Sequence, residues 1–75
     1  MSRLPQIRSK DLVKFFLKQG FEICRQTGSH LRLNHSDGRG ITVAMHNQPV
    51  SLGTLHSILR QAGMNRDQFL KVFKK

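Results

Sequence analysis

Several residue types are scarce in this chain of 75 residues, and each scarcity removes a class of protein. The single cysteine, Cys24, can form neither an internal disulfide nor a cysteine-based zinc site. Apolar runs are no longer than three residues, as in Phe15-Phe16-Leu17, whereas a membrane-spanning helix needs roughly 20. The first eight residues lack the apolar run of a signal peptide. We therefore expect a cytoplasmic protein with no membrane association.

Acidic residues are scarce as well, because four Asp and Glu stand against thirteen Lys and Arg, for a net charge of +9. The four carboxylates lie on separate predicted elements, so they do not form the acidic site of a two-metal nuclease. We expect no metal and no small-molecule cofactor. A chain this basic is suited to bind a polyanion, with RNA or an acidic protein as its partner. The only aromatic residues are five phenylalanines at core-like positions, which leaves no platform for stacking bases.

Hydrophobic spacing predicts a helix over residues 9–19, with Ser9 as its N-cap and Gly20 where a left-handed stop is expected. Its outer face carries a lysine at every fourth position, namely Lys10, Lys14 and Lys18. A second helix and a short third helix lie near the C-terminus. Their predicted N-terminal caps are Ser51 and the capping box formed by Asn65 and Gln68.

Between the first two helices lie three short runs in which apolar and polar residues alternate, as in half-buried strands. They cover residues 21–26, 29–35 and 41–46, and a turn at 36–40 separates the last two. This order predicts an α+β fold of the α-β-β-β-α type with a short C-terminal helix. Two helices would cover the apolar face of a three-stranded antiparallel sheet. We expect a single domain over residues 1–75.

The alternation also constrains how the strands pair, because a slip of one residue would send every side chain to the wrong face. The register that matches the faces predicts four pairs, which are His30 with His46, Arg32 with Ala44, Ile23 with Leu33, and Gln26 with His30. We therefore expect His30 and His46 to be neighbours on the solvent face, with Arg32 one pleat away, unless a bulge interrupts a strand.

Histidine both takes and gives a proton near neutral pH, and RNA carries its own nucleophile in the 2′-hydroxyl beside each phosphate. His30 is therefore the candidate general acid/base of an RNA-cleaving protein. The residues expected to bind or position RNA around it are Gly28, Ser29, Arg32, His46, Lys14 and Lys18. His46 is also a candidate second acid/base. Taken alone, a strand histidine is more often an ordinary surface residue, and a lysine stripe is more often a solvated helix face.

The chain as a whole resembles the HicA toxins, the small mRNA interferases of HicA–HicB toxin–antitoxin modules. The landmarks of this resemblance are Leu4-Pro5, Gly20-Phe21-Glu22, the segment Arg25-Gln26-Thr27-Gly28-Ser29-His30, residues 35–39, His46 and residues 53–63. The resemblance implies a double-stranded-RNA-binding-domain-like fold with His30 as the catalytic histidine. It further implies ribosome-independent mRNA cleavage, growth arrest, and neutralisation by a HicB-type antitoxin that covers the site. Where the family often has Val-Pro before the last-strand histidine, this chain has Val43-Ala44-Met45-His46.

Three other interpretations stay open. The chain could be a non-catalytic RNA-binding module of the same fold, since many such domains only bind. It could be a protein-interaction domain whose basic surface meets an acidic partner. It could also be a family member that has lost its activity, although His30 is retained.

Overall fold

The computed structural model describes residues 6–73 and confirms the α+β class and the α-β-β-β-α order. Its elements in chain order are β1 (Ile7–Arg8), α1 (Ser9–Lys18), β2 (Phe21–Thr27), β3 (His30–His35), β4 (Gly40–Ala44), β5 (Pro49–Val50), α2 (Leu52–Gln61) and α3 (Arg66–Val72). The Leu4-Pro5 landmark lies outside the described residues. No helix within residues 6–73 has the length and apolar character needed to cross a bilayer.

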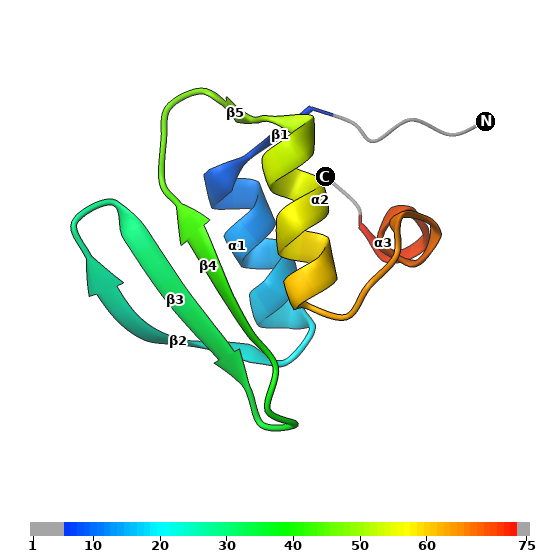
Figure 1. The fold of residues 1–75 in the computed structure, drawn as a ribbon, viewed down its shortest axis with the longest axis horizontal. Helices are drawn as coiled ribbons and strands as arrows, with labels where there is room; N and C mark the ends of the chain where they lie inside the picture. The colour runs from blue at the N-terminus through cyan, green and yellow to red at the C-terminus, as the bar shows by residue number, and fades with distance from the viewer. Residues whose placement is uncertain (1–5, 74–75) are drawn as a thin grey trace.

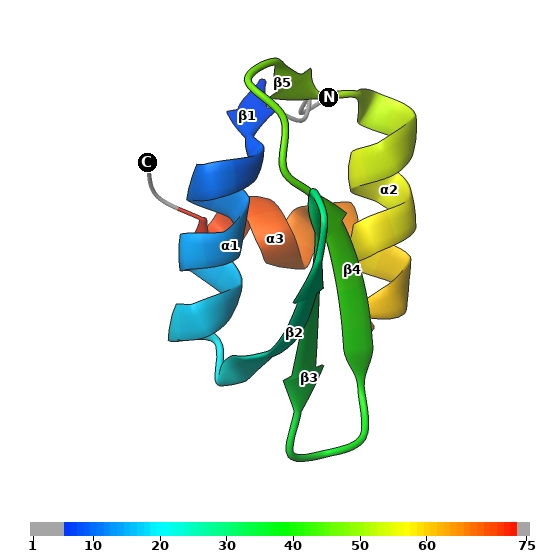
Figure 2. The ribbon, with the colours of Figure 1, turned by 90° about the vertical axis from the view of Figure 1, so that its left-hand side faces the viewer.

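The molecule has two main layers. Strands β2, β3 and β4 form an antiparallel sheet in that order. Figure 2 shows this sheet in front, with α1 and α2 together behind it, and Figure 1 shows α3 on the far side of the helices. Because both helices cover the same face of the sheet, the opposite face is open to solvent. We call these two faces the inner face and the outer face.

The inner face forms the core together with the helices. Alternate residues of β3 and β4 point into it, and the helices contribute aromatic and aliphatic side chains. The largest fully buried side chains are Phe16, Phe69, Ile7, Leu12, Leu33, Ile41, Leu55, Ile58 and Leu59. The outer-face positions between the buried strand residues remain available for polar side chains, as the alternation predicted.

A second, two-stranded pairing was not predicted. β1 pairs with β5 in antiparallel fashion, Ile7 with Val50 and Arg8 with Pro49. It joins the segment that enters α1 to the segment that enters α2 (Figure 1). Two paired residues are too few for an alternation pattern, so hydrophobic periodicity gives no signal for such a pairing.

The predicted helix caps were correct at two of the three starts. Ser51 accepts a hydrogen bond from the backbone N–H of Thr54 at 3.2 Å, and the capping box of Asn65 and Gln68 is present. The prediction for Ser9 was wrong. Ser9 is the first residue of α1, is fully buried, and donates its hydroxyl hydrogen to the Ala44 carbonyl oxygen at 2.7 Å. Its hydroxyl thus joins the start of α1 to the end of β4 instead of capping the helix.

The predicted pairing of β3 with β4 was wrong by two residues. His30 lies opposite Ala44, and Arg32 lies opposite Thr42. The reason is the turn, where the backbone N–H of His35 donates to the Arg39 carbonyl at 2.8 Å and fixes a tighter hairpin than we expected. A slip of two residues keeps every side chain on its own face, so the polarity pattern could not detect it.

The pairing of β2 with β3 contains a bulge, and the predicted register holds only without one. Ile23 pairs with Leu33 as predicted, but the register shifts between Ile23 and Arg25. Beyond the shift, Thr27 and not Gln26 lies opposite His30. The residues of β2 after the bulge therefore point to the opposite faces from those that we expected.

Candidate functional site

An open hollow on the outer face contains the candidate histidine. It is lined by Arg25, Thr27, His30, Arg32 and Thr42, which come from all three strands. We call it the outer-face hollow. Two of its five residues, His30 and Arg32, were predicted as site residues from the sequence. The other three, Arg25, Thr27 and Thr42, were not.

His30 is the first residue of β3 and is exposed, as expected. It follows a two-residue hairpin turn in which Gly28 has a φ of +59°, a left-handed conformation that glycine adopts without steric cost. Ser29 acts here through its backbone, because its carbonyl accepts a hydrogen bond from the N–H of Met45 at 2.7 Å. Both turn residues thus fix the backbone conformation next to His30.

Two hydrogen bonds orient the Arg32 side chain, one to β4 and one within β3. Its Nη1 donates to Thr42 Oγ1 at 3.2 Å, and its Nε donates to Asn34 Oδ1 at 3.2 Å. The guanidinium lies over Gly40, where a β-carbon would come within 2.9 Å of Cζ of Arg32. The absence of a side chain at Gly40 therefore leaves the room that this guanidinium occupies.

The outer-face hollow is strongly cationic. Within residues 6–73, the ion pairs between side chains involve Asp37 with His35 and with Arg39, and none reaches Arg25, His30 or Arg32. In the same part of the chain no three His, Cys, Asp or Glu residues lie close enough together to hold a metal ion. An anion that enters the hollow would therefore find cationic side chains that form no ion pair with a carboxylate of residues 6–73.

His46 does not lie beside His30. β4 ends at Ala44, so His46 belongs to the following segment, and it lines a different hollow with Gln48, Ser51 and Thr54 near the start of α2. The predicted pair of neighbouring histidines on the sheet is therefore wrong, for the register reason given above.

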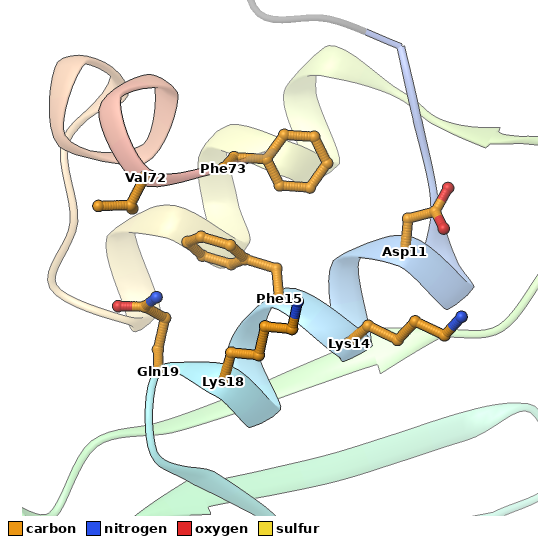
Figure 3. Close-up of a pocket in the computed structure, with 7 residues that line it drawn as sticks. All are labelled: Asp11, Lys14, Phe15, Lys18, Gln19, Val72 and Phe73. Carbon is orange, nitrogen blue, oxygen red and sulfur yellow. The ribbon is translucent and has the colours of Figure 1, made fainter. Parts of the chain in front are cut away.

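Lys14 and Lys18 also lie elsewhere. They line a groove between α1 and the end of α3, together with Phe15, Gln19, Asp11, Val72 and Phe73 (Figure 3). The structure brings neither lysine into the outer-face hollow, because α1 covers the inner face of the sheet. Their expected contact with RNA stays a prediction, and it would have to involve a separate part of the RNA.

One sequence signal could have located Thr27. Gly28-Ser29 is a two-residue hairpin loop with glycine at its first position, and such a loop makes its flanking residues, Thr27 and His30, a directly opposed pair. No comparable signal marks the bulge, so Arg25 could not have been assigned to the outer face from the alternation alone.

A second histidine–arginine group lies at the turn between β3 and β4. His35 accepts a hydrogen bond at Nδ1 from the backbone N–H of Asp37 at 3.1 Å, and its ring packs edge-on against Phe21. Arg39 donates to Asp37 Oδ2 at 2.8 Å and to the Ala62 carbonyl at 2.5 Å, at the C-terminal end of α2. We call these residues the turn cluster.

The pKa of Asp37 is lowered in this cluster. Partial desolvation of the carboxyl raises it, but hydrogen bonds from the backbone and the side chain of Arg39, together with the charges of Arg39 and His35, lower it more. The ionised Asp37 therefore holds the Arg39 side chain, which joins the turn to the end of α2. His35 thus lies at the edge of the core and at the start of the turn.

Comparison with known protein families supports the resemblance noted in the sequence. Residues 9–64 match a family model described as the HicA toxin of bacterial toxin–antitoxin systems. The matched stretch runs from the start of α1 to just beyond α2, and it includes every residue of the outer-face hollow. Among curated proteins, none matched the chain.

Proposed function

Since the chain belongs to the HicA family of bacterial toxins, we propose that it is an endoribonuclease that cuts mRNA in the outer-face hollow. The observation that carries this proposal is the grouping of the exposed His30 with Arg25 and Arg32 in a hollow without a neutralising carboxylate among residues 6–73. A toxin role and an antitoxin partner follow from the family itself. An mRNA target would place the protein in the cytoplasm.

The proposed chemistry uses the nucleophile that RNA supplies. The 2′-oxygen attacks the adjacent phosphorus while His30, in its neutral form, accepts the 2′-hydroxyl proton. The bond from phosphorus to the 5′-oxygen then breaks, and that oxygen takes a proton from the imidazolium or from water. The products are a 2′,3′-cyclic phosphate and a 5′-hydroxyl end. This sequence of steps needs no group other than a proton carrier and positive charge.

The positive charge comes from the guanidinium groups. Negative charge builds up on the non-bridging phosphate oxygens as the five-coordinate phosphorane forms, and donors fixed in advance stabilise it at the least reorganisation cost. Arg32 meets this condition because Thr42 and Asn34 already orient it. Gly28 and Ser29 act on the backbone that carries His30.

One observation favours a second candidate, an RNA-binding module without catalysis. Within residues 6–73 no side chain or backbone group forms a hydrogen bond with the His30 ring, whereas a catalytic imidazole is often oriented by such a partner. RNA itself would have to orient the ring in the nuclease. The two candidates share the RNA ligand and differ only in turnover.

Replacing His30 tests the proposal. His30→Ala should lower the rate of RNA cleavage by about 10²–10⁴-fold, because it removes the proton carrier, and it should relieve growth arrest in cells that express the protein. His56→Ala, an exposed histidine on α2, is the matched control and should cleave like the wild type. Circular dichroism melts would show that both variants fold. If wild-type protein binds RNA but leaves it intact, the binding module is the correct interpretation.

We further propose that the antitoxin is of the HicB type and covers the outer-face hollow. An acidic partner would be attracted to this cationic face and would exclude RNA from it. Hydrogen exchange of the complex can check this proposal. If the backbone amides of β3 are no better protected in the complex than in the free toxin, the proposal is contradicted.

A further inference from the structure

The bulge in β2 determines which side chains reach the outer-face hollow. Ile23 lies opposite Leu33, a fully buried inner-face residue. Regular alternation would therefore place Arg25 on the inner face, opposite Leu31. The register shift between Ile23 and Arg25 instead places Arg25 opposite Arg32, on the outer face. An extra residue in one strand has this effect, and bulges are frequent beside functional sites, where they redirect a side chain.

The resulting arrangement is unfavourable for the free protein. Directly opposed residues have β-carbons about 4.5–5.5 Å apart, and like charges at that spacing destabilise a sheet. No carboxylate within residues 6–73 forms an ion pair with either arginine. A directly opposed pair of arginines that lines one hollow, with no carboxylate within residues 6–73 in an ion pair with either, indicates a site for an anionic ligand.

The side chains of the two arginines differ in how many hydrogen bonds they form within the protein. Arg32 is already oriented by Thr42 and Asn34. Among the described residues, the Arg25 side chain has no hydrogen-bond or ion-pair partner, although it lines the same hollow. A ligand that enters would find one guanidinium in place and could draw in the other. Each guanidinium presents N–H donors in a planar fork that matches the oxygens of a phosphate.

From this geometry we infer that Arg25 and Arg32 together bind the scissile phosphodiester beside His30, and that Arg25 is a phosphate-binding residue of the site. Thr27 lies opposite His30 and completes the same wall of the hollow. This inference rests on the proposed function for the identity of the ligand, an RNA phosphodiester. It adds a residue that neither the family match nor the sequence pattern assigned.

The test measures binding separately from cleavage. The probe is a fluorescent oligoribonucleotide with 2′-O-methyl groups throughout, which cannot be cut because it lacks a free 2′-hydroxyl. Arg25→Gln should weaken its binding about tenfold, the loss expected for one charged hydrogen-bonding group. It should also lower the slope of log affinity against log salt by about 0.7, as expected for one phosphate contact on a single strand.

Arg66→Gln is the matched control. Arg66 is an exposed residue of α3, on the side of the helices away from the sheet (Figure 1), and its replacement removes the same charge. It should change the affinity less than twofold. Arg25→Lys keeps the charge but loses the fork, so its affinity should lie between those of the wild type and Arg25→Gln. Thermal melts of all three variants show whether each one folds.

The outcomes separate this inference from the proposed function. Equal affinities of Arg25→Gln and Arg66→Gln would overturn the phosphate site, as would a wild-type protein that does not bind the probe. The nuclease proposal would still be decided by His30→Ala. A selective loss of binding in Arg25→Gln would support the phosphate site even if wild-type protein never cut RNA.

Discussion

The β3–β4 hairpin carries two histidine–arginine groups, and their side chains differ in their partners. In the turn cluster, the Arg39 side chain bonds to Asp37 and to the end of α2, and His35 packs on Phe21. In the outer-face hollow, the arginines have no carboxylate partner among the described residues.

The comparison shows that cations of the same residue type differ in the partners that the fold gives them. Nε and Nη1 of Arg39 both donate within the fold, so this residue contributes to stability. Cations that the fold leaves without a counter-charge remain available for a ligand. The two groups therefore respond differently to the same substitution, and this difference can be measured.

The largest difference is expected between Arg39→Gln and Arg32→Gln. Arg39→Gln removes charged hydrogen bonds to Asp37 and Ala62 and a cation–π contact with Phe21 whose Cζ-to-centroid distance is 5.2 Å. We expect it to lower the free energy of unfolding by about 1–3 kcal/mol in urea titrations.

Arg32→Gln should change that free energy by less than about 0.5 kcal/mol, because it removes exposed hydrogen bonds and also a like-charge repulsion. Its effect should appear in RNA cleavage instead. Equal losses of stability in the two variants would remove the distinction between the turn cluster and the outer-face hollow.

A smaller effect is expected from Gly40→Ala, which sharpens the comparison within the hollow. The new β-carbon would lie 2.9 Å from Cζ of Arg32 and 2.9 Å from Oδ1 of Asn34, so the guanidinium must shift. We expect cleavage to fall by about fivefold, which corresponds to roughly 1 kcal/mol. Gly53→Ala is the control, because its β-carbon would meet no atom within 4 Å. If both variants cleave like wild type, the orientation of Arg32 is unimportant.

The smallest effect concerns the pH dependence of the turn cluster. The folded-state pKa of Asp37 lies below its ordinary value of 3.8, so the ionised carboxylate stabilises the fold at pH values above 3.8. This stabilisation is lost as the pH falls below 3.8 and through the folded-state pKa. Asp37→Asn should therefore lower the melting temperature slightly at pH 7 and reduce its dependence on pH in that acidic range. An unchanged acid profile would show that Asp37 contributes nothing measurable.

Much of the fold could be predicted from the sequence because local patterns determine it. Alternation placed His30 and Arg32 on the solvent face, and capping residues located the starts of α2 and α3. The register of β3 with β4 could not be predicted, since a two-residue slip leaves the face of every side chain unchanged. It depends on the hydrogen bonds of the turn, which the polarity of the strands does not encode.

The candidate site could be predicted only in part. His30 followed from its chemistry and from the resemblance to the HicA toxins. Arg25 did not, because the bulge that turns it outward depends on tertiary pairing with β3. His46 was misplaced because the β3–β4 register differs by two residues from the predicted one and because β4 ends at Ala44, two residues before it.

The bulge in β2 also bears on how the protein behaves at high concentration. β2 is an edge strand of the sheet, and a regular edge offers unpaired backbone groups to which a second molecule can add a strand. Here an incoming chain would meet an irregular backbone at Cys24 and the positive charge of Arg25 beside it. The same register shift that brings Arg25 to the outer face thus makes fibrous aggregation along this edge unfavourable.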